Sequence, residues 1–383
     1  MKLQKIAVLL TAASVTLSSV GNAVACTAMM ITDKQGNAYS GKTMEYSTPQ
    51  PTSMQYFPAG TQVTSLRPSG KEGLSFKTKY PVLGVAAHIM PKSKLDTMIE
   101  AANDQGLSLS SNELISKTPY YADPDSANLM ATDLATYLLG NFKTVSEVKQ
   151  ALQVGDVKVW LPKVPFTNNL EMPIHYVLFD KSGAGIVIEF TNGTQNIYDN
   201  PVGVAANAPE FPWHLKNLNN YAQLTNVDKN IGQFNKLKVM APDSGNALSN
   251  LPSTQISAGR FIRAAFYTNY VRKANSPSEA VITLAHILNN FDRPYDLTID
   301  VGSGFYGDGP SSGNKASSEV TLFTWMNDKV RNHYYLRTID AMNFAKFEIN
   351  KLASINKVVR VEMNQISDSQ LDGTQLMLNA SNR

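Results

Sequence analysis

Cys26 is the residue on which the chemistry of this sequence centres, because it is the only cysteine among 383 residues. It directly follows Ala23-Val24-Ala25, a small-x-small site of the type that signal peptidases cleave, after a basic start and an apolar stretch at residues 6–20. Cleavage there would make Cys26 the first residue, with a thiol and a free α-amine. A thiolate is a nucleophile, and an α-amine titrates at roughly pH 8, so the amine can accept the thiol proton. The sequence therefore predicts an N-terminal cysteine nucleophile.

Two other interpretations of Cys26 stay open. The sequence Ala23-Val24-Ala25-Cys26 partly resembles a lipoprotein signal, in which the cysteine is lipidated, although the usual Leu three residues earlier is absent. A lone cysteine can also be a small buried hydrophobic residue. The segment that follows, Thr27 to Ile31, has the composition of a buried strand, which differs from the polar tether that usually follows a lipid anchor.

Composition and charge exclude several classes of protein. A net charge of +3 with 17% charged residues gives no electrostatic footprint for nucleic acid, and 43% hydrophobic residues suffice for a large core. No stretch after the leader approaches the roughly 18 apolar residues of a membrane span, so we expect no membrane association after signal removal. One cysteine allows no internal disulfide. The export signal indicates a bacterial periplasmic or secreted protein.

Hydrophobic periodicity predicts an α+β protein in which two antiparallel sheets are covered by helices. We expect residues 1–25 to be a cleaved signal peptide and residues 26–383 to form a single domain. The predicted strands are residues 26–32, 38–44, 80–88, 98–109 with a turn at 103–106, a meander of 175–180, 185–190, 195–198 and 202–206, and then 320–326, 333–338, 344–349 and 357–363. The predicted helices are residues 126–139, 144–152, 259–273 and 277–291. Residues 48–58 are expected to be a loop, 222–257 an exposed excursion, and 364–383 a frayed end.

Three motifs match chemistry that their surroundings do not support. Residues 36–43 fit the phosphate-loop pattern, but the proline-containing segment after Thr43 cannot continue as the required helix. Residues 302–307 fit a dinucleotide fingerprint without a following helix, and residues 312–315 fit SxxK inside a Gly/Ser loop. The five histidines show no metal-ligand spacing. No motif assigns the chemistry to a metal or a serine triad, and we expect no cofactor.

Other residues could complete a site around Cys26. Glu45, at the end of the returning hairpin strand, could orient the amine. Asn207 ends a predicted strand and could donate to an oxyanion, and Arg260 opens a helix and could orient groups near the thiol. Each of the three, taken alone, also fits an ordinary surface or turn position.

Taken together, these stretches resemble the choloylglycine hydrolase and penicillin V acylase family. The stretches that carry the resemblance are Cys26-Thr27, residues 41–46, Asn103-Asp104-Gln105-Gly106-Leu107, Ala206-Asn207-Ala208-Pro209 with Trp213-His214 and Asn217-Leu218, and Arg260-Phe261-Ile262-Arg263 with Phe266. They run in order from Cys26 to about Met342. The resemblance implies an N-terminal nucleophile hydrolase with an αββα sandwich that cleaves linear amides, such as conjugated bile salts, penicillin V and N-acyl homoserine lactones.

The resemblance also implies roles for individual residues. Cys26 would be the nucleophile and, through its amine, the base, while Asn207 would be an oxyanion donor and Arg260 a site residue. Lys42 and Glu45 depart from the Arg and Asp that are usual in the family. Glu45 keeps the charge with one more methylene, and Lys42 loses the bidentate fork of arginine but can still assist electrostatically.

A second departure concerns the remaining oxyanion position. It falls on Glu113, with Asn112 beside it, and a carboxylate there would oppose an oxyanion. The amide of Asn112 or a backbone N–H would have to substitute for it.

We therefore expect an exported hydrolase that forms an acyl-thioester on Cys26. The alternative is a lipid-anchored or catalytically inactive binding protein of the same fold. Transfer of the acyl group to an amine is a third outcome of the same acyl-enzyme. The resemblance further implies a homotetramer.

Overall fold

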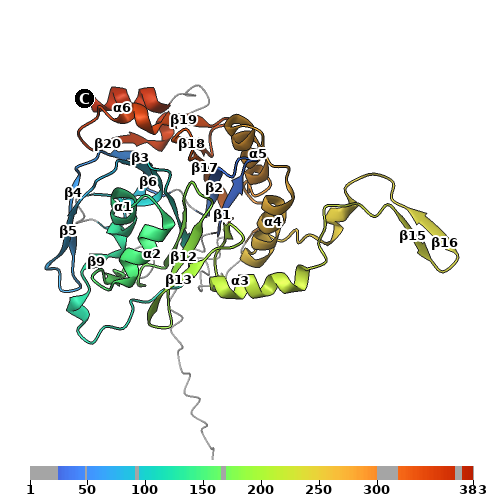
Figure 1. Ribbon diagram of the computed structural model, residues 1–383, viewed down its shortest axis with the longest axis horizontal. Helices are drawn as coiled ribbons and strands as arrows, with labels where there is room; N and C mark the ends of the chain where they lie inside the picture. Colours follow the sequence, from blue (N-terminus) through green and yellow to red (C-terminus); the bar gives the residue numbers. More distant parts are fainter. Residues whose placement is uncertain are drawn as a thin grey trace, which may run out of the picture.

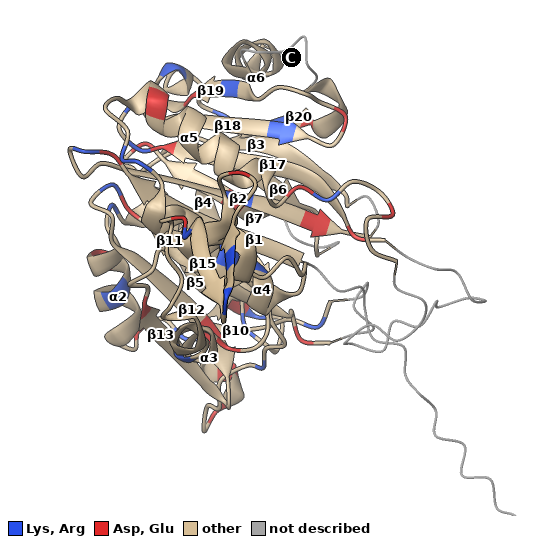
Figure 2. Ribbon diagram, turned by 90° about the vertical axis from the view of Figure 1, so that its right-hand side faces the viewer, with Lys and Arg blue, Asp and Glu red and all other residues tan. Residues whose placement is uncertain are grey.

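Two antiparallel sheets stack face to face, and helices cover the outer face of each, as expected for an αββα sandwich (Figure 1). The computed structural model describes residues 25–47, 50–90, 95–164, 170–299, 318–366 and 373–382. Charged residues of both signs are scattered over the ribbon without a face of one sign (Figure 2). Among the described residues, no helix has the length and apolar character needed to cross a bilayer.

The first sheet has six strands in the order β14-β1-β2-β17-β18-β19. Its members are β1 (Ala25–Thr32), β2 (Ala38–Tyr46), β14 (Val204–Ala205), β17 (Val320–Asp328), β18 (His333–Thr338) and β19 (Ala345–Glu348). Two helices, α4 (Ser257–Tyr270) and α5 (Pro277–Asn289), pack on β1, β2 and β17. The hairpin that begins at Cys26 therefore lies between the helices and the second sheet.

The second sheet has eight strands in the order β13-β12-β11-β8-β7-β6-β3-β20. Its members are β3 (Thr52–Phe57), β6 (Val82–Ala87), β7 (Thr97–Asn103), β8 (Ser108–Glu113), β11 (Ile174–Phe179), β12 (Gly185–Thr191), β13 (Thr194–Asp199) and β20 (Val359–Glu362). Helices α1 (Ala131–Asn141) and α2 (Val145–Gln153) contribute Leu134, Leu138 and Val148 to a fully buried cluster with Leu109 of β8. This apolar packing closes the outer face of the second sheet.

Smaller elements surround the sandwich. They are β4 (Gln62–Leu66) with β5 (Glu72–Lys77), β9 (Leu129–Met130) with β10 (Val159–Trp160), the helix α3 (Phe211–Asn217), the hairpin β15 (Ile231–Phe234) and β16 (Leu237–Met240), the helix α6 (Gly373–Ser381), and the 3₁₀ turns η1 (Pro124–Ser126), η3 (Leu218–Tyr221), η4 (Asn246–Asn250), η5 (Ile349–Leu352) and η6 (Met363–Gln365). Residues 222–256 form a projecting arm that carries β15 and β16 away from the body (Figure 1).

Most of the predicted elements are confirmed. The hairpins at 26–44, 98–109 and 320–338 are present, and so are the helices at 144–152, 259–273 and 277–291, with ends that differ by a few residues. Thr144 and Ser276 cap α2 and α5 by accepting hydrogen bonds from Glu147 and Glu279. Lys42 and Thr43 lie inside β2, so the phosphate-loop match is a strand. The matches at 302–307 and 312–315 lie outside the described residues.

Two predictions near the chain ends were wrong. Residues 52–57 form β3 instead of a loop, because the prolines of this segment flank the strand and leave its ladder hydrogen bonds intact. Residues 373–381 form helix α6 instead of fraying. The helix packs on β19 and β20, where the Met377 side chain is fully buried. Strands β19 and β20 are edge strands of the two sheets, and α6 covers them. The polar composition of the C-terminal residues gave no indication of this packing.

Two further predictions were partly wrong. The first long helix begins at Ala131, because Leu129 and Met130 pair with β10 first, and Ser126 closes only a 3₁₀ turn. The last strand of the meander, β14, leaves the eight-stranded sheet and pairs with β1. Gly203, with φ +65°, turns the chain at that point and accepts a hydrogen bond from the Met30 amide.

Candidate active site

The pairing of β1 with β2 distributes the predicted site residues over two faces of the sheet. Cys26 lies opposite Met44, and Ala28 lies opposite Lys42, so these side chains share one face. Lys42 reaches groups of the eight-stranded sheet, which identifies this face as the one between the sheets. Glu45, one residue beyond Met44, is on the opposite face toward α4, because side chains alternate along a strand. The hairpin thus presents a lysine beside the thiol and a carboxylate behind it.

Cys26 is completely buried at the start of β1. Its Sγ lies 3.4 Å from Met44 Sδ, and its backbone nitrogen donates to Asn207 Oδ1 over 2.7 Å. Ala25 precedes it in this chain, so the nitrogen is a peptide amide. Burial raises the pKa of the thiol to about 12, and the nearby Lys42 ammonium offsets part of that rise. The thiol is therefore protonated while residue 25 is attached.

Asn207 connects Cys26 to the rest of the site. Its Oδ1 accepts from the Cys26 nitrogen and from Arg260 Nη2, the latter over 2.8 Å, while its Nδ2 donates to the carbonyl of Glu113 over 3.0 Å. Sequence reasoning correctly brought Asn207 to Cys26. The oxygen of the amide faces the cysteine nitrogen in this geometry, and the oxyanion role stays a prediction.

Arg260 is fully buried in the first turn of α4 and holds the backbone of Cys26. Its Nη1 donates to the carbonyl of Cys26 and, over 2.6 Å, to Thr27 Oγ1, while its Nε donates to the Gln255 carbonyl over 2.9 Å. Burial lowers the pKa of the guanidinium to about 10, which leaves it charged at neutral pH. The predicted arginine therefore bridges Cys26 and Asn207.

Glu45 is fully buried between positive groups. Thr321 Oγ1 lies 3.3 Å from Glu45 Oε1, and burial raises the pKa of the carboxyl to about 6, while Arg260 and Arg293 oppose that rise. A β-bulge at Leu322 separates the register of Thr321 from that of the following residues. Bulges of this kind re-aim side chains near active sites. Arg293 and Thr321 carried no signal in the sequence.

Lys42 is fully buried and faces the second sheet. Its Nζ contacts Glu100 Oε1, lies 2.5 Å from the Ser111 carbonyl and 3.7 Å from Met44 Sδ. Because Met44 Sδ also contacts Cys26 Sγ, the ammonium stands beside the thiol. Sequence reasoning identified Lys42 but missed Glu100, its partner from β7.

Asn112 and Glu113, the two oxyanion candidates, end strand β8 beside the site. Asn112 is buried, its Nδ2 donates to the Ala206 carbonyl over 2.7 Å, and its Oδ1 has no hydrogen-bond partner among the described residues. Glu113 enters the site through its backbone carbonyl, which accepts from Asn207. The structure therefore brings the Glu113 carbonyl to Asn207 and the Asn112 side chain to Ala206, the residue before it.

Two residues that sequence reasoning did not assign to the site hold the backbone of Asn207. Ser257 Oγ accepts from the Asn207 amide over 2.9 Å, and His214 Nε2 lies 2.8 Å from the Asn207 carbonyl. Burial lowers the pKa of His214 to about 4, so the ring is neutral and donates to that carbonyl. Trp213-His214 is among the stretches that carry the family resemblance, but the sequence did not show that His214 contacts the Asn207 carbonyl.

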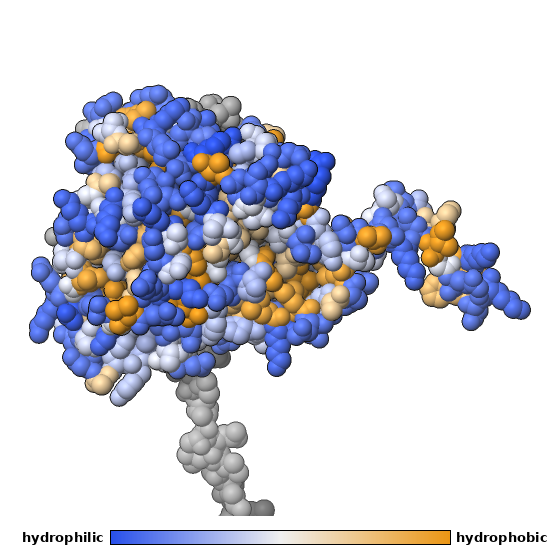
Figure 3. Space-filling view, in the orientation of Figure 1, coloured by the Kyte–Doolittle hydropathy of each residue, from blue (hydrophilic) through white to orange (hydrophobic). Residues whose placement is uncertain are grey.

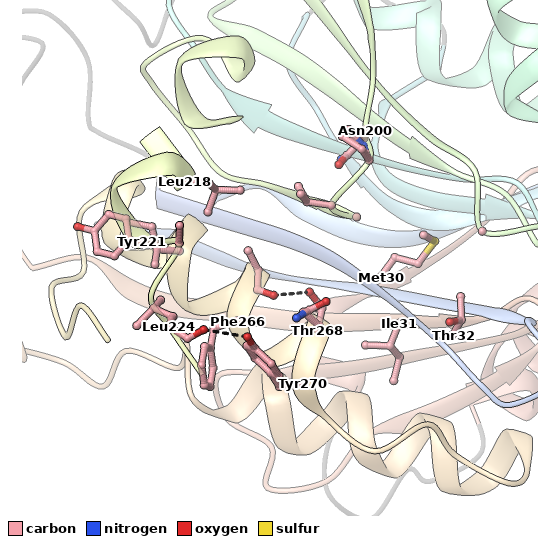
Figure 4. Close-up of a pocket in the computed structure, with 18 residues that line it drawn as sticks. Met30, Ile31, Thr32, Asn200, Leu218, Tyr221, Leu224, Phe266, Thr268 and Tyr270 are labelled. Atoms are coloured by element: carbon pink, nitrogen blue, oxygen red, sulfur yellow. Dashed lines mark hydrogen bonds between the residues drawn. The ribbon is translucent and has the colours of Figure 1, made fainter. Parts of the chain in front are cut away.

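A separate open pocket of about 440 Å³ lies near the far end of β1 (Figure 4). Its labelled lining residues are Met30, Ile31, Thr32, Asn200, Leu218, Tyr221, Leu224, Phe266, Thr268 and Tyr270. None of the predicted site residues lines it. The described residues also contain no group of three His, Cys, Asp or Glu side chains suited to a metal ion.

Several known proteins are similar to this chain in sequence. A bile salt hydrolase/transferase of Lactiplantibacillus plantarum is 30% identical over 71% of this chain and 78% of its own length. One from Clostridium perfringens is 28% identical over 85% and 93%. A penicillin V acylase of Pectobacterium atrosepticum is 26% identical over 75% of each chain.

Solved structures agree as well. A mutant of the conjugated bile acid hydrolase from Clostridium perfringens superposes with a TM-score of 0.74 and 25% identity over 89% of this chain and 98% of its own. Penicillin V acylase from Agrobacterium tumefaciens has a TM-score of 0.68 over 88% and 91%, and at 21% identity this likeness concerns the fold. The sequence profile of the linear amide C–N hydrolases, choloylglycine hydrolase family, matches residues 26–359. This chain belongs to that family and is a hydrolase of linear amides with the N-terminal nucleophile fold.

Proposed function

We propose that the mature protein begins at Cys26 and cleaves linear amides of N-acyl compounds through an acyl-thioester. The observation that carries the proposal is the cluster at the Cys26 nitrogen: Asn207 Oδ1 accepts from it, and Arg260 donates both to that oxygen and to the Cys26 carbonyl. A free amine at this position would be held by the same oxygen. This arrangement supports the proposal that Asn207 and Arg260 orient an N-terminal Cys26.

The reaction proceeds in two steps. The α-amine of Cys26 takes the thiol proton, the sulfur attacks the amide carbonyl, and Asn207 with a backbone N–H stabilises the oxyanion. The C–N bond breaks, the amine gives its proton to the leaving group, and the acyl group stays on sulfur. Water then attacks the thioester and releases the acid. Glu45 and Arg260 orient the terminus, and Lys42 stabilises the thiolate.

Removal of the leader explains how a deeply buried thiol becomes reactive. Ala25 pairs with Glu45 and lies directly on the site. Its departure would uncover Cys26, reduce the burial that raises the thiol pKa to about 12, and create the amine. We propose that this happens during export to the periplasm or the outside of the cell.

The substrates are drawn from the class that the relatives' names define. Bile salt hydrolases and a penicillin V acylase are among the relatives, so conjugated bile salts and penicillin V come first. N-acyl homoserine lactones, which the family resemblance implies, come next. Several relatives are named hydrolase/transferase, which favours acyl transfer to amines as a second activity.

Two measurements test the proposal. Intact-mass analysis of the exported protein should give a chain that starts at an unmodified Cys26, whereas a diacylglyceryl mass would support the lipid-anchored alternative. Release of taurine, glycine or the other leaving amine is then followed for the wild type and Cys26→Ser. A Ser variant as fast as the wild type, or a processed enzyme that is inert on all three substrate classes, would overturn the proposal. Added amines distinguish transfer from hydrolysis by the products formed.

We also propose a homotetramer, with the arm as a contact between copies. The arm exposes Ile231, Phe234, Leu237 and Met240, which are 71%, 72%, 64% and 76% accessible, and its hydrophobic atoms are visible in Figure 3. A two-stranded hairpin is marginally stable by itself, and exposed apolar side chains of this size mark association sites. Light scattering should give a tetramer mass that Phe234→Ser lowers; a wild-type monomer at micromolar concentration would refute this assembly.

A further inference from the structure

Glu100 is a buried carboxylate to which the proposed reaction assigns no part. This carboxylate lies on β7 of the second sheet, is completely inaccessible to solvent, and is satisfied on both oxygens. Oε1 contacts the Lys42 ammonium, and Oε2 accepts from Trp325 Nε1 over 2.7 Å. A buried charge is stable only when it is paired, and Glu100 has a specific partner on each oxygen.

The backbone of β7 is shaped to deliver this side chain. Val85 pairs with Glu100 and Ala86 pairs with Met98, so Ile99 is an extra residue in a β-bulge directly before Glu100. Bulges re-aim the neighbouring side chain. The backbone of Glu100 is also held in place, because its carbonyl accepts a hydrogen bond from Tyr334 Oη over 2.9 Å. The strand thereby points one carboxylate between the sheets toward the hairpin that carries the nucleophile.

Lysine at position 42 makes this carboxylate necessary. An arginine stays charged even when buried, but a buried lysine readily loses its proton, because desolvation disfavours the ammonium. A carboxylate in contact favours the charged form. Glu100 therefore keeps Lys42 an ammonium at the place where it adjoins Met44 and the Cys26 thiol.

We propose that Glu100 is a positioning residue of the amide-cleaving reaction, which holds Lys42 charged and fixed beside Cys26 from the opposite sheet. The inference rests on the proposed function of Cys26 as nucleophile. Glu100 reaches the sulfur only through Lys42. Its removal should therefore change the reactivity of the thiol more than the affinity for substrate.

Other groups near the pair set the background for its pH dependence. They are Cys26 of β1, Glu45 of β2, Ser110 of β8, Trp325 and Tyr334 of β17 and β18, and Arg260 of α4. Arg260 stays charged near neutral pH, and burial holds the pKa of Tyr334 above its usual range. Glu45 titrates at lower pH than a thiol does. The α-amine of processed Cys26 titrates at roughly pH 8 in the wild type and in the Glu100 variants alike. A difference between them on the alkaline side of the profile therefore reports on the Lys42–Glu100 pair.

The test measures the thiol directly. In the processed enzyme, the rate of Cys26 alkylation by iodoacetamide is followed against pH for the wild type, Glu100→Gln and Glu100→Asp. The charge of Glu100 by itself raises the pKa of the Cys26 thiol, but Lys42 lowers that pKa more strongly. Because Glu100→Gln removes the partner that keeps Lys42 charged, we expect the alkylation midpoint to rise by about one pH unit and kcat to fall roughly 10- to 100-fold at nearly constant KM. Glu100→Asp retains the charge and should lie between the two, which keeps the test informative where the Gln variant does not fold.

A rescue variant separates positioning from a structural role. Arginine needs no carboxylate to stay charged, so Lys42→Arg combined with Glu100→Gln should return the alkylation midpoint toward that of the wild type. Asp133→Asn is the matched control, because Asp133 is a buried carboxylate that accepts from Ser65 in the outer layer. It should leave the midpoint unchanged.

Two results would overturn the inference. They are an unchanged midpoint in both Glu100 variants, and a Lys42→Arg combination no better than Glu100→Gln alone. Alkylation needs no substrate, so an enzyme inert on every amide would refute the proposed function while these outcomes still decide the role of Glu100.

Discussion

Replacement of Arg260 by methionine removes the group that fixes the backbone around Cys26, the proposed nucleophile. The guanidinium donates to the Cys26 carbonyl, to Thr27 Oγ1 and to Asn207 Oδ1, all in a buried setting. A hydrogen bond to a charged group contributes about 1.5–3 kcal/mol. If the bonds to Cys26 and Asn207 act fully in the transition state, their loss costs about 3–6 kcal/mol. At about 1.4 kcal/mol per tenfold change, kcat/KM should fall roughly 10²- to 10⁴-fold.

Arg263, one turn later on α4, provides the matched control. It is also largely buried, but it donates to the carbonyls of Pro252 and Thr254 and to Gln255 Oε1, which lie before the helix. Arg263→Met should lower the melting temperature to a similar degree while keeping most of kcat/KM. The assay is the initial rate of amine release from a conjugated bile salt or penicillin V, with melting curves for both variants. An Arg260→Met enzyme within threefold of wild type, or equal losses in the two variants, would refute the reasoning.

Three further predictions concern pH and packing. Glu45 has a pKa raised by burial to about 6, so kcat/KM should rise with pH around 6, and Glu45→Gln should abolish this limb. The same raised pKa stabilises the fold at pH values below the ordinary glutamate pKa of 4.5, and this contribution is lost as pH rises through about 6. Met377→Ala should lower the free energy of unfolding by about 2–5 kcal/mol in a denaturant titration, because this side chain of α6 is fully buried where the helix packs on β19 and β20. Gly84→Ala should give insoluble protein, since its Cβ would lie 2.2 Å from the Glu100 carbonyl oxygen; soluble, active protein would contradict the packing of β6 on β7.

Local patterns determined the hairpin that presents Cys26. Alternating residues on both sides of the turn at Asp33 to Asn37 define β1 and β2, and their register follows from the turn and from the buried faces. The same reasoning located Glu45 and Lys42, because residues on one strand have known relative directions. It also found the caps at Thr144 and Ser276, which depend only on neighbours within one turn.

Such local patterns do not predict contacts between residues that are distant along the chain. Glu100 reads as an ordinary charged residue in a strand, and only the stacking of two sheets brings it to Lys42. Arg293 and Thr321 meet Glu45 across more than 240 residues of chain. The course of β14 toward β1 and the docking of α6 likewise depend on which surface remains uncovered once the sheets have formed.

The sequence by itself determined the family and the layered fold and predicted Cys26 as the nucleophile, because the motifs that carry the resemblance and the short periodic segments are properties of neighbouring residues. Only the tertiary structure decided which charges surround the sulfur. Buried ionic groups need partners, and those partners are supplied by strands and helices that are distant along the chain and adjacent only after folding.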